Sequence, residues 1–251
     1  MLPIEVIFTD GRLRVSHCRR NSGATGQTLI SFTSIGHHLG GIEVQKPEFF
    51  AAGTGYDDIL FVDDLQKSWG SKINFDLLLR EIAPFTTGKK VDTLGNSMGG
   101  FLAFLAPRFF DVRHAVAFVP QIDTNFSALP WEGRLDNYLP GLRRWDYSCV
   151  AGHLVDQTKY IAFTGTVAQD IKHLDLLPQS DNIEIFQLPI EKHIIPRILK
   201  AHGLLDTLVR SALSGTITPD WFQDEIIRLL LSRPRIDPES LQRPSAFIPS
   251  T

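Results

Sequence analysis

The sequence predicts a single α/β domain over residues 1–251, built on a mostly parallel central sheet with helices on both faces. Two observations lead to this prediction. Short, β-rich apolar runs alternate with segments of helical period, the pattern of a sheet that is covered on both sides. No repeat, low-complexity stretch or Gly/Ser linker divides the chain, and 43% of its 251 residues are hydrophobic, enough for one continuous core.

Eight apolar runs are expected to form strands. The first two are joined by Asp10-Gly11, a dipeptide typical of hairpin turns, so they are expected to pair antiparallel. Longer segments separate the remaining runs, which fits parallel pairing. In chain order the runs span residues 4–8, 12–17, 27–33, 58–62, 90–94, 115–119, 160–164 and 183–188.

Helices are expected at residues 75–82, 101–105, 194–205 and 219–231. The last is amphipathic, and Thr218 and Pro219 suit its N-cap and its first turn. The tail after Pro234 is expected to be irregular.

Residues 123–156, after the sixth strand, show no strand pattern. One interpretation is a small cap that folds over the carboxyl edge of the sheet. The other is an ordinary excursion whose aromatic side chains fill the core. The aromatic residues concerned are Trp131, Tyr138, Trp145 and Tyr147.

Charge and composition exclude several classes of partner. The net charge is −3 and the pI is near 6.2, so the chain lacks the excess of Lys and Arg that would follow a phosphate backbone. The N-terminus carries Glu5 and no basic region, unlike a signal peptide. Apolar runs such as 226–231 are too short to span a bilayer. We therefore expect a soluble, cytoplasmic protein with neither a nucleic-acid nor a membrane partner.

Cys18 and Cys149 could pair, but two free thiols are the commoner arrangement.

The strongest chemical signal is Gly95-Asn-Ser-Met-Gly-Gly100, which joins the strand at 90–94 to the helix at 101–105. A Gly-x-Ser-x-Gly turn in this context projects the serine hydroxyl above the strand ends. Gly95 and Gly99 are needed because side chains there would collide with backbone as the chain reverses. Ser97 is therefore the candidate nucleophile, beside the positive end of the following helix.

With this motif in this context, the chain resembles the α/β-hydrolase superfamily over essentially its whole length. The elbow is similar to that of small bacterial members whose substrates are undefined. The resemblance implies an α/β-hydrolase fold, with a base and an acid that follow the serine along the chain. One departure is that Phe32-Thr-Ser-Ile-Gly36 replaces the His-Gly frequent after the third strand.

A serine hydroxyl needs an adjacent base near neutral pH, and in the superfamily this base follows the last strand. Of the eight histidines, only His193 has that position, whereas His202 lies further into the following helix. The acid is expected after the strand at 160–164, where Asp170 and Asp175 are the candidates. Asp170 is favoured because it is the only carboxylate in the first part of that loop, although it comes later than the most frequent spacing. Asp175 is expected on the following helix as a solvated side chain.

One oxyanion donor is expected to be the N–H of Met98, directly after the nucleophile. The other is expected in the turn after the third strand, with Ile35 as the first candidate. Gly36 and His37 of the same turn are expected to line the substrate site. His37 and His38 could bind a metal, but no third ligand is near in the sequence, so neither a metal nor another cofactor is expected.

Asp63, Asp64 and Trp69 follow the fourth strand, at the edge where ligands bind in open α/β sheets. Trp69 beside polar groups would suit a sugar or another polar acyl acceptor. The alternative is a packed indole beside solvated aspartates.

The expected function is that of a cofactor-independent serine hydrolase that cleaves a carboxylic ester through an acyl-enzyme. Ser97 attacks, His193 removes and returns the proton, and Asp170 orients the imidazole. An acyltransferase that passes the acyl group to a sugar or other hydroxyl is one alternative. A catalytically silent hydrolase-fold binding protein is another. The expected ligand is a small-molecule ester or an acylated sugar, and the sequence indicates neither its acyl group nor the oligomeric state.

Overall fold

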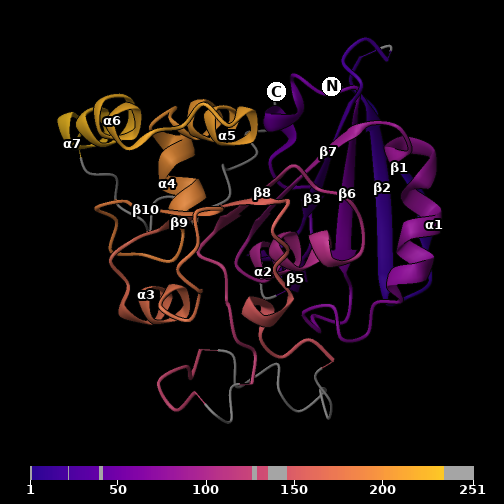
Figure 1. Cartoon of the computed structure of the whole chain (residues 1–251), viewed down its shortest axis with the longest axis horizontal. Helices are drawn as coiled ribbons and strands as arrows, with labels where there is room; N and C mark the ends of the chain where they lie inside the picture. The colour runs from indigo at the N-terminus through magenta and orange to yellow at the C-terminus, as the bar shows by residue number, and fades with distance from the viewer. Residues whose placement is uncertain (1, 22, 40–41, 126–128, 135–145, 235–251) are drawn as a thin grey trace, which may run out of the picture.

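The computed structural model describes residues 2–21, 23–39, 42–125, 129–134 and 146–234 (Figure 1). Within these residues, one sheet has the strand order β1-β2-β6-β3-β7-β8-β9-β10. A separate hairpin pairs β4 with β5. The strands are β1 (Glu5–Thr9), β2 (Leu13–Arg19), β3 (Gln27–Phe32), β4 (His37–Leu39), β5 (Ile42–Val44), β6 (Asp58–Asp64), β7 (Lys90–Asn96), β8 (His114–Phe118), β9 (Lys159–Thr164) and β10 (Ile183–Gln187).

The sheet is mostly parallel, as the sequence predicted. From β6 to β10 every pair of neighbours is parallel, whereas β2 is antiparallel to both β1 and β6. The β1–β2 turn forms where expected, since Asp10 Oδ1 accepts hydrogen bonds from the N–H groups of Arg12 and Leu13, both at 2.8 Å. The β4–β5 hairpin was not expected, because residues 34–41 were interpreted as one Gly-rich turn.

Helices cover both faces of the sheet. The buried hydrophobic side chains of α1, α2 and α3 pack into one core cluster, and those of α4 to α7 pack into a second cluster on the opposite face. In the part of the chain that the structure describes, short 3₁₀ turns lie at Phe50–Gly53, Ala106–Arg108 and Val150–His153. The helices are α1 (Phe75–Thr86), α2 (Met98–Leu105), α3 (Ala168–Leu174), α4 (Ile195–Ala201), α5 (Leu205–Ser214), α6 (Pro219–Phe222) and α7 (Arg228–Ser232).

Two expected helices differ in detail. Of the helix expected at residues 194–205, Ile195–Ala201 forms, as α4. Gly203 at φ 66° turns the chain after α4, and α5 begins at Leu205 and continues to Ser214. Thr218 caps α6 through a hydrogen bond from the Trp221 N–H, and Pro219 begins it, as expected. A π-helical segment at Gln223–Ile227 then joins α6 to α7.

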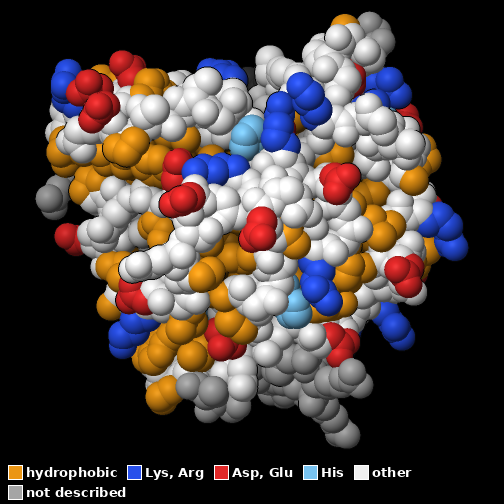
Figure 2. Space-filling model, in the orientation of Figure 1, with side chains coloured by type: hydrophobic (Ala, Val, Ile, Leu, Met, Phe, Trp, Pro, Cys, Tyr) orange, Lys and Arg blue, Asp and Glu red, His pale blue; other side chains and the backbone are white. Residues whose placement is uncertain are grey.

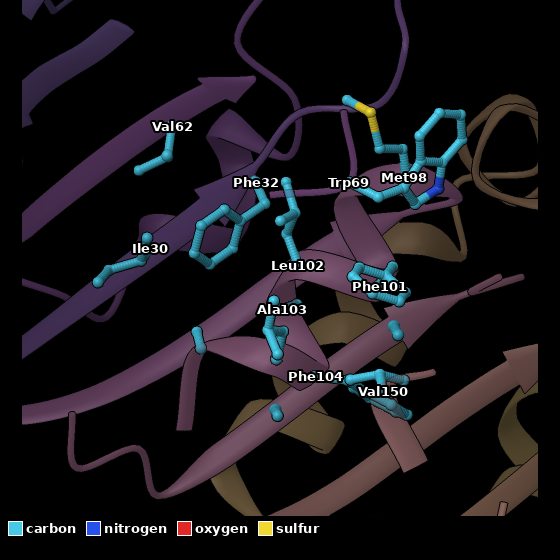
Figure 3. Close-up of a cluster of buried hydrophobic side chains, with 14 of the residues drawn as sticks. Ile30, Phe32, Val62, Trp69, Met98, Phe101, Leu102, Ala103, Phe104 and Val150 are labelled. Carbon is cyan, nitrogen blue, oxygen red and sulfur yellow. The ribbon is translucent and has the colours of Figure 1, made fainter. Parts of the chain in front are cut away.

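All residues of α2 are buried, as expected for a helix that is hydrophobic all round. Figure 3 shows Phe101, Leu102 and Phe104 of this helix among side chains of the neighbouring strands. Packing on every side fixes the helix, and with it the position of the residue just before its first turn, Ser97.

The two ends of the segment 123–156 are hydrogen-bonded to each other. Thr124 donates its N–H to the Ser148 carbonyl, and Val150 donates to the Ile122 carbonyl. Trp131 and Tyr147 pack on the core, as the excursion interpretation expects. Tyr138 and Trp145 lie outside the described residues, so the cap stays a prediction.

Cys18 and Cys149 are free thiols. None of the described helices combines the length and the apolar character needed to cross a bilayer. On the face in Figure 2, Lys and Arg are interspersed with Asp and Glu.

Candidate active site

The backbone around Ser97 has the strand–turn–helix geometry that the motif predicts. Ser97 lies between the end of β7 and the start of α2, at φ 56° and ψ −116°. A positive φ is unfavourable for a residue with a Cβ, so the surrounding structure must hold this turn in place. The Ser97 N–H donates to the Phe118 carbonyl at 2.8 Å, and the Ser97 carbonyl accepts from the Phe101 N–H at 3.0 Å. The side chain is 5% exposed, at the carboxyl end of the sheet.

The two glycines that flank Ser97 have no room for a side chain. A Cβ on Gly95 would lie 2.0 Å from the Gly99 carbonyl oxygen, and one on Gly99 would lie 2.2 Å from the Phe32 carbonyl oxygen. Both obstacles are backbone atoms, one within the elbow and one at the end of β3, and neither can move aside as a flexible side chain could. The expected requirement for glycine at both positions therefore has a direct steric cause.

The structure brings together the three side chains that the sequence singled out for catalysis. His193, in the loop between β10 and α4, places Nε2 3.1 Å from Ser97 Oγ. Its Nδ1 lies 2.9 Å from both carboxylate oxygens of Asp170, in the first turn of α3. A carboxylate only accepts hydrogen bonds, so Nδ1 carries the proton and Nε2 is free to accept the one on Ser97 Oγ.

Asp170 is ionised in this site. Burial raises its pKa, but the hydrogen bond from His193 and the guanidinium of Arg134 outweigh burial and hold the pKa below its ordinary value. Asp170 lies on α3 and not in the loop where it was expected, because the helix begins earlier. Asp175, expected on that helix, is its C-cap residue and is exposed to solvent. Of the two candidate acids, the structure therefore places Asp170 beside the histidine.

A charged network, which the sequence analysis missed, supports Asp170. Arg134 Nη1 donates to Asp170 Oδ1 at 2.7 Å, and Arg134 also pairs with Glu132. Glu132 Oε2 accepts from His173 Nε2 at 3.1 Å, while His173 Nδ1 accepts from the Ile122 N–H at 3.2 Å. Burial raises the pKa of Glu132, but its bonds to Arg134 and His173 lower it to about 2. The segment 123–156 thus reaches the site through two charged residues.

Gln121 is a second missed residue. It follows β8, and its Nε2 donates to Ser97 Oγ at 3.0 Å. Its Oε1 accepts from Trp69 Nε1 at 2.8 Å. Trp69 has no exposed surface, so the structure gives no support to the expectation that its indole binds a substrate directly. The packed-indole alternative describes it better.

The aspartates before Trp69 are also internal, and they are not the solvated groups of that alternative. Asp63 accepts from Thr33 Oγ1 at 2.6 Å and from Arg14 Nε at 2.5 Å. Asp64 accepts from the N–H groups of Ser68 and Gly70 at 2.8 and 3.0 Å. Both carboxylates therefore hold the chain around the end of β6.

The two expected oxyanion donors belong to segments that meet at this edge. Met98 begins α2, so its N–H has no acceptor within the helix. The close approach of Gly99 to the Phe32 carbonyl sets this helix end against the end of β3, where the turn with Ile35 begins. Gly36 has φ 112°, a conformation suited to glycine. Their roles in oxyanion and substrate binding stay predictions, and the side chain of His37 lies outside the described residues.

The turn that contains Ile35 is anchored by Glu48. Ser34 Oγ donates to Glu48 Oε1 at 2.5 Å, and Gln45 Nε2 donates to the Ser34 carbonyl at 3.0 Å. Burial raises the pKa of Glu48 to about 7. Among the residues that the structure describes, no group of three or more His, Cys, Asp and Glu side chains is arranged to hold a metal ion.

Solved structures share this architecture. The capsule O-acetyltransferase of Neisseria meningitidis serogroup A matches with a TM-score of 0.58 at 14% identity, over 83% of this chain and 94% of that one. The esterase LipW of Mycobacterium marinum matches with a TM-score of 0.57 at 12% identity, over 86% and 81% of the two chains. MPT51 of Mycobacterium tuberculosis matches with a TM-score of 0.54 at 12% identity, over 85% of this chain and 100% of that one. This protein has the α/β-hydrolase fold.

At these identities the likeness concerns the α/β-hydrolase fold alone. Neither protein-family models nor curated proteins give a match to the sequence. Proteins with one fold can catalyse different reactions, because the reaction depends on the side chains at the strand ends. The function must therefore be inferred from the geometry at Ser97.

Proposed function

We propose that this protein is a serine hydrolase that cleaves a carboxylic ester through an acyl-enzyme on Ser97. One observation carries the proposal: Ser97 Oγ, His193 and Asp170 form an unbroken hydrogen-bonded series on an elbow with a strained backbone. Strain at a non-glycine residue persists only where the surrounding structure enforces it, and it concentrates at functional sites.

In the proposed reaction, Ser97 Oγ attacks the ester carbonyl carbon while His193 Nε2 takes the hydroxyl proton. Asp170 stabilises the resulting imidazolium through Nδ1. The negative charge on the tetrahedral intermediate is held by the N–H of Met98 and by an N–H near Ile35. The intermediate collapses, and the alcohol leaves with the proton from His193. Water then attacks the acyl-enzyme with His193 as base, which releases the acid and restores Ser97.

Acyl transfer is the second candidate. The same acyl-enzyme could be discharged by a sugar hydroxyl in place of water. The fold likeness to a capsule O-acetyltransferase, over 94% of that chain, is the observation that favours it. The two reactions differ only in the second acceptor, so product analysis separates them.

Labelling with a fluorophosphonate probe tests the nucleophile. We expect stoichiometric labelling of Ser97, identified by mass spectrometry, and none in Ser97→Ala. Ser16→Ala is the matched control, because Ser16 is equally buried at 5% exposure but lies on β2. It should label at the wild-type rate.

The products formed from p-nitrophenyl acetate, butyrate and octanoate are then analysed with and without sugar acceptors. Free acid indicates hydrolysis, and an acylated sugar indicates acyl transfer. Labelling that persists in Ser97→Ala contradicts the mechanism. If the wild-type protein neither labels nor turns over esters, the proposal is wrong and the binding-protein alternative is favoured.

A further inference from the structure

Ser97 Oγ has a second polar neighbour besides His193. Gln121 Nε2 lies 3.0 Å from it, on a side chain that is 2% exposed. The other end of this amide meets Trp69, whose indole is fully buried in the cluster that also contains Met98 (Figure 3). Three side chains from three separate segments therefore form a continuous hydrogen-bonded line that ends on the nucleophile.

The indole N–H of Trp69 determines the direction of both hydrogen bonds along this line. An indole N–H can only donate, so the oxygen of the Gln121 amide must face Trp69. The NH₂ group must then face Ser97, and Ser97 Oγ must accept from it. With that bond made, the hydroxyl proton of Ser97 is left for His193 Nε2, the acceptor that the Asp170 contact selects.

We infer that Gln121 is a catalytic residue of the proposed hydrolase, which holds Ser97 Oγ with its proton toward His193, and that Trp69 is a positioning residue acting through Gln121. The inference depends on the proposed function. It gives Trp69 a role that needs no contact with substrate: the indole prevents the amide from turning round. A reversed amide would offer its oxygen to Ser97 and compete with His193 for the proton.

A purely structural role for the pair would have a different signature. Gln121 would then only satisfy a buried N–H of Trp69, and its loss would lower the free energy of unfolding without slowing the chemistry of the folded protein. Rates must therefore be measured on folded protein, with the melting temperature recorded beside them.

A double-mutant cycle separates these roles. We expect Gln121→Leu and Trp69→Phe each to lower the second-order rate of fluorophosphonate labelling, and kcat for p-nitrophenyl acetate, about tenfold. KM should change less than about twofold. The double variant should be no slower than Gln121→Leu alone, because Trp69 acts through Gln121. Gln187→Leu is the control, since that amide bonds the Gly165 carbonyl and should leave the rate unchanged. If Gln121→Leu is poorly folded, Gln121→Met offers a second apolar side chain of similar length.

The pH profile gives an independent readout. Gln121→Glu keeps an oxygen for Trp69, but as a carboxylate it draws the Ser97 proton away from His193. Its rate relative to wild type should therefore rise as the pH falls and the carboxyl group becomes protonated. Folded Gln121 variants that label at the wild-type rate would overturn the inference and leave the proposed function standing. If Trp69→Phe lowers the labelling rate equally in the wild type and in Gln121→Leu, Trp69 does not act through Gln121. If the wild-type protein does not label at all, both the proposed function and this inference are wrong.

Discussion

Asp170 at the carboxyl end of the sheet and Asp92 at its amino end have closely similar surroundings. Each is a buried carboxylate that accepts from a histidine Nδ1 and pairs with an arginine. Burial raises the pKa of each, and the donors around each lower it further than burial raises it. The partners are His193 and Arg134 for Asp170, and His114 and Arg113 for Asp92.

The two ends differ in what lies beyond the histidine. His193 Nε2 meets a serine hydroxyl, whereas His114 Nε2 faces Gly215, on which a Cβ would lie only 3.0 Å away. Asp92 is also saturated with donors, because Arg113 binds both of its oxygens and Tyr56 adds a hydroxyl. The presence of an aspartate, a histidine and an arginine in contact is therefore not sufficient to make an active site. The difference is the strained turn that places a serine hydroxyl against His193 Nε2.

The largest contrast is expected between the two histidines. His193→Ala should lower kcat/KM for p-nitrophenyl acetate by about 10³-fold or more, because Ser97 loses its base. His114→Ala should keep kcat/KM within about twofold and lose about 1 kcal/mol of unfolding free energy, since Asp92 loses one donor. Urea denaturation and ester hydrolysis on the same preparations check both. Equal losses of activity would show that the two clusters are not functionally distinct.

The three aspartates give the next contrast. Asp170→Asn should lower kcat/KM about 10²-fold or more, because an amide holds the wrong histidine tautomer. Asp175→Asn should change it less than about threefold, as an exposed carboxylate contributes little. Both should melt within a few degrees of wild type. Asp92→Asn should keep its specific activity but lose about 3 kcal/mol of stability, because a buried ion pair is broken. If Asp175→Asn is the crippled variant, the triad acid is misassigned by five residues.

Glycines at the two ends differ in the room around them. Gly99→Val should abolish labelling and cost more than about 2 kcal/mol, because its Cβ would overlap the Phe32 carbonyl. Gly55→Val, at the amino end, has no atom within 4 Å of its Cβ and should cost under about 1 kcal/mol. Thermal melts and probe labelling compare them. Wild-type melting and labelling in Gly99→Val would refute the elbow geometry.

The smallest expected effect concerns acid stability. The folded pKa of Glu132, about 2, lies below its ordinary 4.5. Its contribution to stability is therefore fully present above pH 4.5 and is lost as the pH falls from there toward 2. Between pH 6 and pH 3, wild type should lose on the order of 2 kcal/mol more than Glu132→Gln. Urea titrations at both pH values measure this, and parallel losses in the two proteins would place the acid-sensitive group elsewhere.

Local patterns were sufficient to predict the fold and the elbow. The strands, the parallel order and the glycine turn follow from apolar periods and from steric needs that lie within a few residues of each other. His193 and Asp170 were within reach because parallel strands end at one edge, so chain order limits which loops can meet Ser97. The break between α4 and α5 had a local signal as well, in Gly203.

Gln121, Glu132 and Arg134 had no such signal. Glu132 and Arg134 come from a segment without periodicity, and their partners on α3, His173 and Asp170, lie 41 and 36 residues away along the chain. Gln121 follows a buried strand like many polar residues, and only the folded chain shows that its amide lies 3.0 Å from Ser97 Oγ. His173 could have been found, since it lies three residues after Asp170 on one helix, and residues at that spacing share a face.

The positive φ of Ser97 has a consequence for the history and the engineering of this protein. Glycine would adopt φ 56° without a Cβ penalty, so the residue that the backbone favours at this position is not the proposed nucleophile. Random drift that is filtered only for a well-folded chain would favour Ser97→Gly. The same holds for a laboratory selection that scores melting temperature alone, in which a gain in stability at this position would remove the proposed nucleophile. Any thermostabilised derivative must therefore be selected for labelling as well as for folding.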